Sequence, residues 1–320
     1  MSTSRPPTPG HHRDDDHSLA PPRVEEVAPG VFAYVQPDGT WWINNTGFVL
    51  DGSRALAIDT CATERRTQAY LDAIAGSGGA APSMLVNTHH HGDHTNGNGL
   101  LPSATIIGHH LCRDAMVRSG IVRPDGLFDP VQWGALTVAP PFVTFTHRLD
   151  LHVGDVLVEL HHFGTAAHTT NDVVAWIPEH RVLFTGDLIF NGGTPFVLMG
   201  SVAGAMVALD RLMEFDAAVV VPGHGPPCTL GAVDTVGSYL RFVQQAAAEA
   251  HEAGLSPLEA ARHIDLGEFA ALSDAERLVG NLHRAYAEIE GARPGDDIDI
   301  AVAFGDMYAF NGNRPLRCLA

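Results

Sequence analysis

Short apolar runs, rich in β-branched and aromatic residues, alternate with turn residues in the first part of the chain. Residues 31–35, 47–50 and 55–59 have this character, and Pro-Asp-Gly at 37–39 and Asp-Gly at 51–52 separate them. Apolar runs bounded by turn signals are typical of β-strands. We therefore expect a strand meander between residues 24 and 59.

Helical and extended patterns alternate over the next 160 residues. Residues 63–75 place Tyr70, Leu71 and Ile74 on one face, which predicts a helix that Gly76 closes. The further elements that we expect are strands at 84–88, 106–107, 156–161, 173–177, 182–184 and 217–221, and helices at 111–117 and 202–213. Two rounds of strands followed by helices predict an α/β protein with two sheets and outer helices.

The two ends of the chain differ from this middle part. Residues 1–23 are rich in Pro, His and Asp and predict a disordered tail. After about residue 239 the pattern becomes helical, with Pro257 opening one helix and residues 278–289 forming another. We expect a catalytic domain at 24–240 and a helical extension at 241–320, packed on its core.

The densest chemical signal is a histidine-rich motif that directly follows the strand predicted at 84–88. Its pattern is His-x-His-x-Asp-His, with His89, His91, Asp93 and His94. Imidazole nitrogens and carboxylate oxygens are ligands for zinc, and catalytic zinc sites keep one position open. In a loop, His89 and His91 can bind one ion while Asp93 and His94 turn toward a second.

Three further candidates lie beside turn residues near later strand ends: His168, Asp187 and His224. Together the seven residues predict a binuclear site. His89, His91 and His168 hold one metal, Asp93, His94 and His224 hold the other, and Asp187 bridges ions roughly 3.5–4 Å apart. Asp59, at the end of an apolar strand, is expected either to hydrogen-bond the ligand loop or simply to form a turn.

Composition narrows the range of partners. The 320 residues carry 37 acidic and 19 basic side chains, a net charge of −18 with histidine neutral. This balance opposes binding to nucleic acid, which needs a basic surface. The four cysteines show no CxxC spacing, so we expect neither a zinc–thiolate site nor disulfides. No segment resembles a signal peptide or a membrane span, which predicts a cytoplasmic protein.

The seven-residue set resembles the signature of the metallo-β-lactamase superfamily, and the likeness runs from about residue 24 to 228. It implies an αββα sandwich with two metal ions, zinc in the first place although iron or manganese is also possible. Asp187 stands where β-lactamases of the commonest type carry a cysteine, which points toward the broader hydrolase branch.

A narrower resemblance is carried by segments outside the metal ligands. Residues 194–204, 209–212, 281–284 and 317–320 are similar to actinorhodin-type cyclases of aromatic (type II) polyketide pathways. This likeness implies closure of the second ring of a poly-β-ketone on an acyl carrier protein, with possible cleavage of its thioester. A metal can stabilise the enolate of an aldol closure or the oxyanion of thioester hydrolysis, and Asp93 can orient the hydroxide.

The same reading gives candidate residues for a substrate pocket and for a partner surface. Trp41, Trp42, Phe190, Phe196 and Met199 are candidates for the wall of a pocket, although core packing explains each one singly. A carrier protein is usually acidic, so docking on this acidic chain needs local arginines, for which Arg65 with Arg66 or Arg113 with Arg118 are candidates.

Two alternatives stay open at this level. The ligand set alone also fits a stand-alone binuclear zinc hydrolase of thioesters or lactones. Part of the same set serves a mononuclear iron persulfide oxygenase in some members of the superfamily. The sequence does not fix the oligomeric state.

Overall fold

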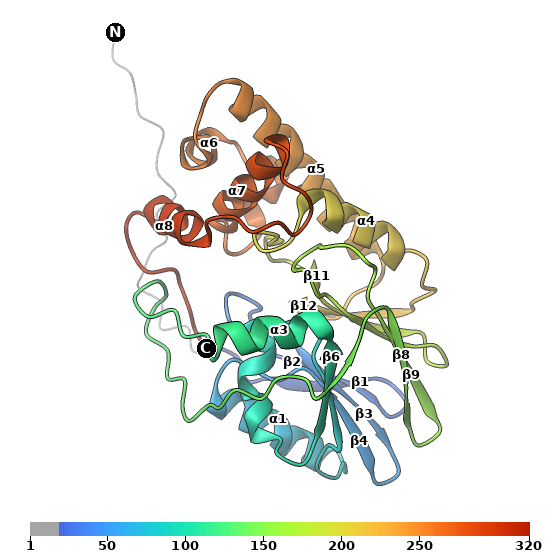
Figure 1. The fold of residues 1–320 in the computed structure, drawn as a ribbon. Helices are drawn as coiled ribbons and strands as arrows, with labels where there is room; N and C mark the ends of the chain where they lie inside the picture. Colours follow the sequence, from blue (N-terminus) through green and yellow to red (C-terminus); the bar gives the residue numbers. More distant parts are fainter. Residues whose placement is uncertain (1–18) are drawn as a thin grey trace.

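A computed structural model describes residues 19–320 (Figure 1). The part of the predicted tail that precedes residue 19 lies outside the described residues, and the first strand already begins at Arg23. The strands are β1 (Arg23–Ala28), β2 (Val31–Val35), β3 (Thr46–Asp51), β4 (Arg54–Ile58), β5 (Met84–Val86), β6 (Thr105–His109), β7 (Val143–Phe145), β8 (Arg148–Val153), β9 (Val156–His161), β10 (Val174–Ile177), β11 (Val182–Phe190) and β12 (Val219–His224). The helices are α1 (Glu64–Gly76), α2 (Gly92–Thr95), η1 (Asn96–Leu100), α3 (His110–Ser119), α4 (Val202–Leu212), α5 (Gly231–Glu252), α6 (Pro257–His263), η2 (Gly267–Ala271), α7 (Arg277–Ile289) and α8 (Ile300–Phe310).

The strands form two sheets that pack face to face. One sheet has the order β1-β2-β3-β4-β5-β6-β7, and the other has the order β12-β11-β10-β9-β8. Apolar side chains of both sheets, such as Val49 and Leu56 from the first and Leu160 and Phe184 from the second, form one buried cluster between them. The two sheets with helices on the outer faces confirm the residue pattern, and their order is the αββα sandwich that the family resemblance implies.

Each outer face has its own apolar cluster. Tyr70 and Ile74 of α1 pack on the outer side of the first sheet against Phe48 and Leu85. On the second sheet, α4 and α5 contact β11, and α7 and α8 pack further out (Figure 1). Helix α5 runs through residues 240 and 241, so the expected domain boundary falls inside a continuous helix.

Strand β11 is longer than the sequence pattern predicts. It continues to Phe190 instead of ending at Phe184, and all nine of its residues are buried. It lies between β12 and β10, and apolar residues follow Asp187 as well as precede it, so the strand continues past the carboxylate. The expectation that Asp187 follows a strand end is therefore wrong, although Gly186 (φ 52°) interrupts the regular ladder beside it.

Candidate metal centre

The seven predicted ligands come together in two clusters that share one residue. His89, His91, His168 and Asp187 form the first cluster, and Asp93, His94, His224 and Asp187 form the second. Within each cluster the ligand atoms all lie within 4.8 Å of one another. The chain reaches this arrangement because the histidine motif follows β5, His168 lies in the loop between β9 and β10, Asp187 lies in the second half of β11, and His224 ends β12.

Asp187 occupies the point where the clusters meet. Its Oδ2 lies 3.2 Å from Nε2 of His168 and 3.4 Å from Nε2 of His224. Its Oδ1 lies 3.0 Å from Nε2 of His94. One carboxylate thus faces histidines of both clusters, which is the arrangement that a bridging ligand requires.

The donor atoms of the site are suited to divalent cations. Nε2 of His89, Nε2 of His94 and Oδ1 of Asp187 are buried and make no hydrogen bond among the described residues, because the 3.0 Å contact between the last two atoms lacks hydrogen-bond geometry. Buried polar atoms are nearly always paired, so these unpaired donors and acceptors facing one another fit a bound cation. Five imidazoles with two carboxylates suit zinc as well as iron or manganese, and the donor set does not select one metal.

Most of the histidines are oriented by hydrogen bonds on the nitrogen that faces away from the clusters. Nδ1 of His94 lies 2.8 Å from Oδ2 of Asp59, and Nδ1 of His224 lies 3.1 Å from the Gly39 carbonyl. Nδ1 of His168 contacts the Phe196 carbonyl. Such contacts fix the tautomer and leave Nε2 free to bind a metal.

His91 has the opposite orientation. Its Nδ1 lies 2.8 Å from Nε2 of His168 inside the first cluster, while its Nε2 lies 3.2 Å from Sδ of Met199. A thioether is a weak acceptor, so Met199 holds this ring through a soft contact rather than a carboxylate.

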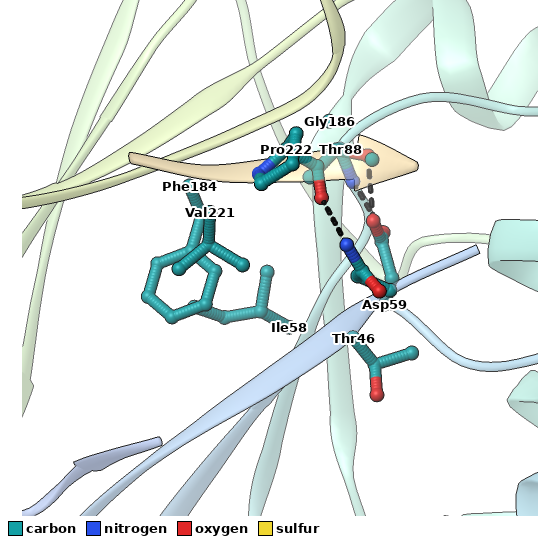
Figure 2. A pocket seen from close by; sticks show the side chains of 10 residues that line it. Thr46, Ile58, Asp59, Thr88, Phe184, Gly186, Val221 and Pro222 are labelled. Atoms are coloured by element: carbon teal, nitrogen blue, oxygen red, sulfur yellow. Dashed lines mark hydrogen bonds between the residues drawn. The ribbon is translucent and has the colours of Figure 1, made fainter. Parts of the chain in front are cut away.

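Asp59 supports the ligand loop from behind. Its Oδ1 accepts a hydrogen bond from the Thr88 N–H at 2.7 Å, and its Oδ2 accepts one from Thr88 Oγ1 at 2.7 Å as well as contacting His94. Figure 2 shows Asp59 pointing at Thr88 beside a small cavity lined by both sheets. The backbone of Asp59 is left-handed (φ 60°), a conformation that Asp tolerates better than most residues.

The electrostatics divide the histidines into two groups. Burial, reinforced by the charge of neighbouring histidines, holds the pKa of His89 and of His91 well below the usual value. Burial also disfavours the charge of His224, but the Asp187 and Asp93 carboxylates outweigh it and raise its pKa to about 9. The metal-free carboxylates are therefore neutralised by protons on histidine, which a bound cation would replace.

The predicted pocket residues surround the clusters but are mostly packed. Trp41 and Trp42 are 9% and 8% exposed, and the Trp41 indole N–H donates to Glu276 at 2.8 Å. Phe190 stacks on the ring of His224, with centroids 5.0 Å apart, and Phe196 lines a small cavity with His168 and Asp187. Their contact with a substrate stays a prediction.

The two arginine pairs proposed for docking differ in accessibility. Arg66 is buried, and its guanidinium donates to Gln36 Oε1 and to the Leu319 carbonyl, both at 2.8 Å. Arg66 is therefore not available to a partner, and the prediction that Arg65 and Arg66 form a docking pair is wrong. Arg113 and Arg118 are exposed on α3, so that pair stays a prediction.

Sequence reasoning missed several residues that hold the site. Asn45 donates to the Pro222 carbonyl at 3.0 Å and so fixes the turn before His224. Asn171 lies 3.0 Å from Nδ1 of His90 in the ligand loop. The only signal for them is an amide residue near a strand end, which is too common to identify a supporting role. Outside the clusters, the rings of His109 and His162 stack on each other with centroids 4.0 Å apart.

Comparisons with known proteins agree with this geometry. The profile of the metallo-beta-lactamase superfamily matches residues 39–224. The chain is 30% identical over 152 residues to a hydroxyacylglutathione hydrolase of Rhodospirillum rubrum, covering 47% of this chain and 50% of that protein. It is 28% identical over 214 residues to an atrochrysone carboxyl ACP thioesterase of Paecilomyces divaricatus, covering 65% of this chain and 60% of that protein.

A solved structure shows the same fold. The DIM-1 metallo-beta-lactamase, from a crystal exposed to ceftazidime, matches with a TM-score of 0.58 at 20% identity, over 71% of this chain and 99% of that chain. This chain belongs to the metallo-beta-lactamase superfamily, whose members are typically metal-dependent hydrolases. It spans about half the length of the curated relatives it matches. Among residues 19–320, no helix has the length and apolar character needed to cross a membrane.

Proposed function

We propose that the protein is a zinc-dependent enzyme that closes a ring in an aromatic polyketide held on an acyl carrier protein and cleaves its thioester. The observation that carries this proposal is the pair of ligand clusters joined by Asp187, set against an aromatic wall that includes Phe190 and Phe196. The ACP thioesterase among the relatives supports a carrier-bound substrate.

Ring closure and thioester hydrolysis share one electrostatic requirement. An aldol closure develops charge on an enolate oxygen, and hydrolysis develops charge on a tetrahedral oxygen. When bound, divalent ions at the two clusters supply Lewis acidity that stabilises either charge.

Asp93 is the carboxylate best placed to handle a proton. Its side chain is 13% exposed, against 4% for Asp187, and its Oδ2 lies 3.3 Å from Nε2 of His224. Burial alone would raise its pKa, but His94 and His224 outweigh burial and lower it, so the group is ionised. Asp93 can therefore orient a water or hold a proton taken from the substrate.

Two of the four segments that resemble cyclases lie next to this centre. Phe196, within residues 194–204, holds His168 through its carbonyl, and Asn281, within residues 281–284, contacts both neighbours of Phe196. This proximity supports a role for both segments at the site.

The test is an incubation of zinc-loaded protein with a carrier-bound polyketide whose first ring is already closed. We expect a bicyclic product and free carrier, both detected by mass spectrometry, and loss of both after chelation. Restoration by added zinc is the matched control. Release of an acid without ring closure would support the thioesterase activity and contradict the cyclase activity. An unchanged substrate would overturn the whole proposal.

A second candidate is a hydrolase of small free thioesters, which the hydroxyacylglutathione hydrolase among the relatives favours. Fast turnover of simple acyl thioesters without any cyclisation would support it. Metal analysis of the purified protein addresses the oxygenase alternative at the same time, because a single iron per chain would point to that class and two zinc ions would exclude it.

A further inference from the structure

Helix α7 carries a stripe of polar side chains, three of them buried and Glu288 half-buried, that faces the loop between β11 and α4. Arg277, Asn281, Arg284 and Glu288 are spaced by four, three and four residues, which places them on one face of a helix. Each of the four makes at least one hydrogen bond to a backbone atom of residues 194–203. Helix α7 thus sets the path of this loop.

Asn281 brackets the residue that orients His168. Its Oδ1 accepts from the Val197 N–H at 2.9 Å, and its Nδ2 donates to the Pro195 carbonyl at 2.8 Å. These two contacts fix the peptide groups on both sides of Phe196, whose own carbonyl contacts Nδ1 of His168. Asn281 is fully buried, so no water competes for these bonds.

Arg284 fixes the next part of the same loop. Its Nε and one terminal nitrogen donate to the Leu198 carbonyl at 3.0 and 2.8 Å. The adjacent residue is Met199, whose Sδ lies 3.2 Å from Nε2 of His91. The guanidinium is 1% exposed and its other terminal nitrogen donates to the Asp296 carbonyl, so backbone carbonyls are its bonding partners.

We propose that Asn281 and Arg284 are positioning residues for the first metal cluster: they fix residues 195–199 so that the Phe196 carbonyl and the Met199 thioether orient His168 and His91. The second cluster has different supports, since Asp59 holds His94 and Gly39 holds His224. Helix α7 therefore supports the first cluster alone, whereas the first sheet and its loops support the second cluster and also reach His89, whose Nδ1 lies 3.1 Å from Thr88 Oγ1.

The test measures metal affinity rather than turnover. Metal-free protein is titrated with zinc against a chromophoric chelator, and with cobalt by absorption, to resolve two binding steps. Asn281→Ala should weaken one step about tenfold and leave the other within about twofold. Asp59→Asn changes the direct partner of His94 and reaches His89 only through Thr88, so it should weaken the other step more than the first. Met199→Leu, which keeps the apolar volume, should weaken the same step as Asn281→Ala.

Tyr286→Phe is the matched control on the same helix. Its hydroxyl donates to the Leu255 carbonyl at 3.0 Å, so the change removes a side-chain hydrogen bond to backbone without touching residues 194–203. It should lower thermal stability and leave both metal affinities unchanged. Equal weakening of both steps by Asn281→Ala, or no weakening by either Asn281→Ala or Met199→Leu, would overturn the inference.

This inference rests on the metal dependence in the proposed function, but experiment can contradict the positioning role and the proposed reaction independently of each other. Protein that binds two ions with the expected pattern yet leaves every thioester intact removes the proposed reaction and retains the positioning role. Protein that cyclises its substrate while Asn281→Ala keeps wild-type affinity at both steps does the reverse.

Discussion

Asp187 is the single residue on which both clusters depend. Its Oδ2 faces His168 and His224, and its Oδ1 faces His94, so removal of the side chain takes a ligand from each cluster. Two groups of histidines then face each other without the anion between them. Substitution of Asp187 therefore tests the binuclear arrangement more directly than substitution of any single histidine.

Asp187→Ala should lose metal and activity together. The expected loss of affinity exceeds the 10- to 100-fold that a supporting residue costs, because a direct ligand of both ions is removed. Metal content per chain after dialysis measures it, with circular dichroism to confirm that the fold persists. Two retained ions with full turnover would show that Asp187 is not the bridge.

His109 links stability to pH through a histidine that belongs to neither metal cluster. Burial, reinforced by His162 and His110, lowers its pKa to about 4, below the value of about 6.5 for an unfolded histidine. The unfolded chain therefore takes up the proton first as the pH falls. The stability that neutral His109 supports is complete above pH 6.5 and is lost between 6.5 and 4.

His109→Asn removes this titration and retains the N-cap of α3, where the His109 side chain accepts from the Leu111 N–H. The loss of unfolding free energy between neutral pH and about pH 5 should be smaller than in the wild type by about 1–2 kcal/mol. Urea unfolding at both pH values measures the difference. Parallel losses in the two proteins would contradict a buried neutral His109.

At the scale of elements, the sequence pattern predicted what local periodicity determines. The ligand motif was placed correctly after β5, because an apolar strand directly precedes it. The length of β11 was missed, since continuation through Asp187 depends on flanking strands that no local window contains. Strand β8 was missed although its exposure alternates, as expected for a half-buried strand.

The residues that orient the metal ligands could not be predicted from local sequence, for a related reason. Asn281 is 84 residues from Val197 in the chain, and Asn45 is 177 residues from Pro222. Such pairs form only when helices and sheets have packed. A single sequence therefore predicted the ligands, which cluster in a motif, but not the residues that orient them.

The close approach of the two sheets depends on Gly47 in β3. A Cβ at this position would lie 2.1 Å from the Phe184 ring of β11, which fills the space above the glycine. Gly47→Ala should therefore lower the unfolding free energy by about 1–3 kcal/mol, measured by denaturant unfolding. Gly47→Ala with Phe184→Leu should recover part of the loss.

Gly76→Ala is the control for this pair, because a Cβ there meets nothing within 4 Å at the end of α1. It should be neutral or stabilising by up to about 1 kcal/mol. Equal stability of Gly47→Ala and the wild type would mean that the sheets are further apart at this point.

At the scale of the whole molecule, the helical extension shares its buried core with the sandwich. One buried cluster includes Trp41 and Leu188 from the sandwich together with Leu282 and Met307 from α7 and α8. The last residues return to the sandwich, where the Leu316 N–H donates to the Leu127 carbonyl at 2.9 Å (Figure 1). The sandwich and the helical extension therefore contact each other in two places, through the shared core and through the last residues of the chain.

This shared core predicts cooperative unfolding. Equilibrium denaturation is followed by two signals, with a chelator present. Tryptophan fluorescence reports on the sandwich, because all four tryptophans precede residue 177. Far-ultraviolet circular dichroism reports on helix content, to which helices α5–α8 contribute strongly. The two curves should coincide, as for a single two-state unit. Glu276→Ala removes the acceptor of the Trp41 indole and should shift both curves together.

Removal of residues 255–320 provides the complementary measurement. It deletes α6, α7 and α8, exposes the cluster that they cover, and takes away every α7 contact to residues 194–203. The shortened chain should bind a hydrophobic dye, unfold without a sharp transition and lose tight metal binding. A truncated protein with a sharp transition and both ions in place would instead make the extension an independent domain, and the two unfolding curves of the full chain would then separate.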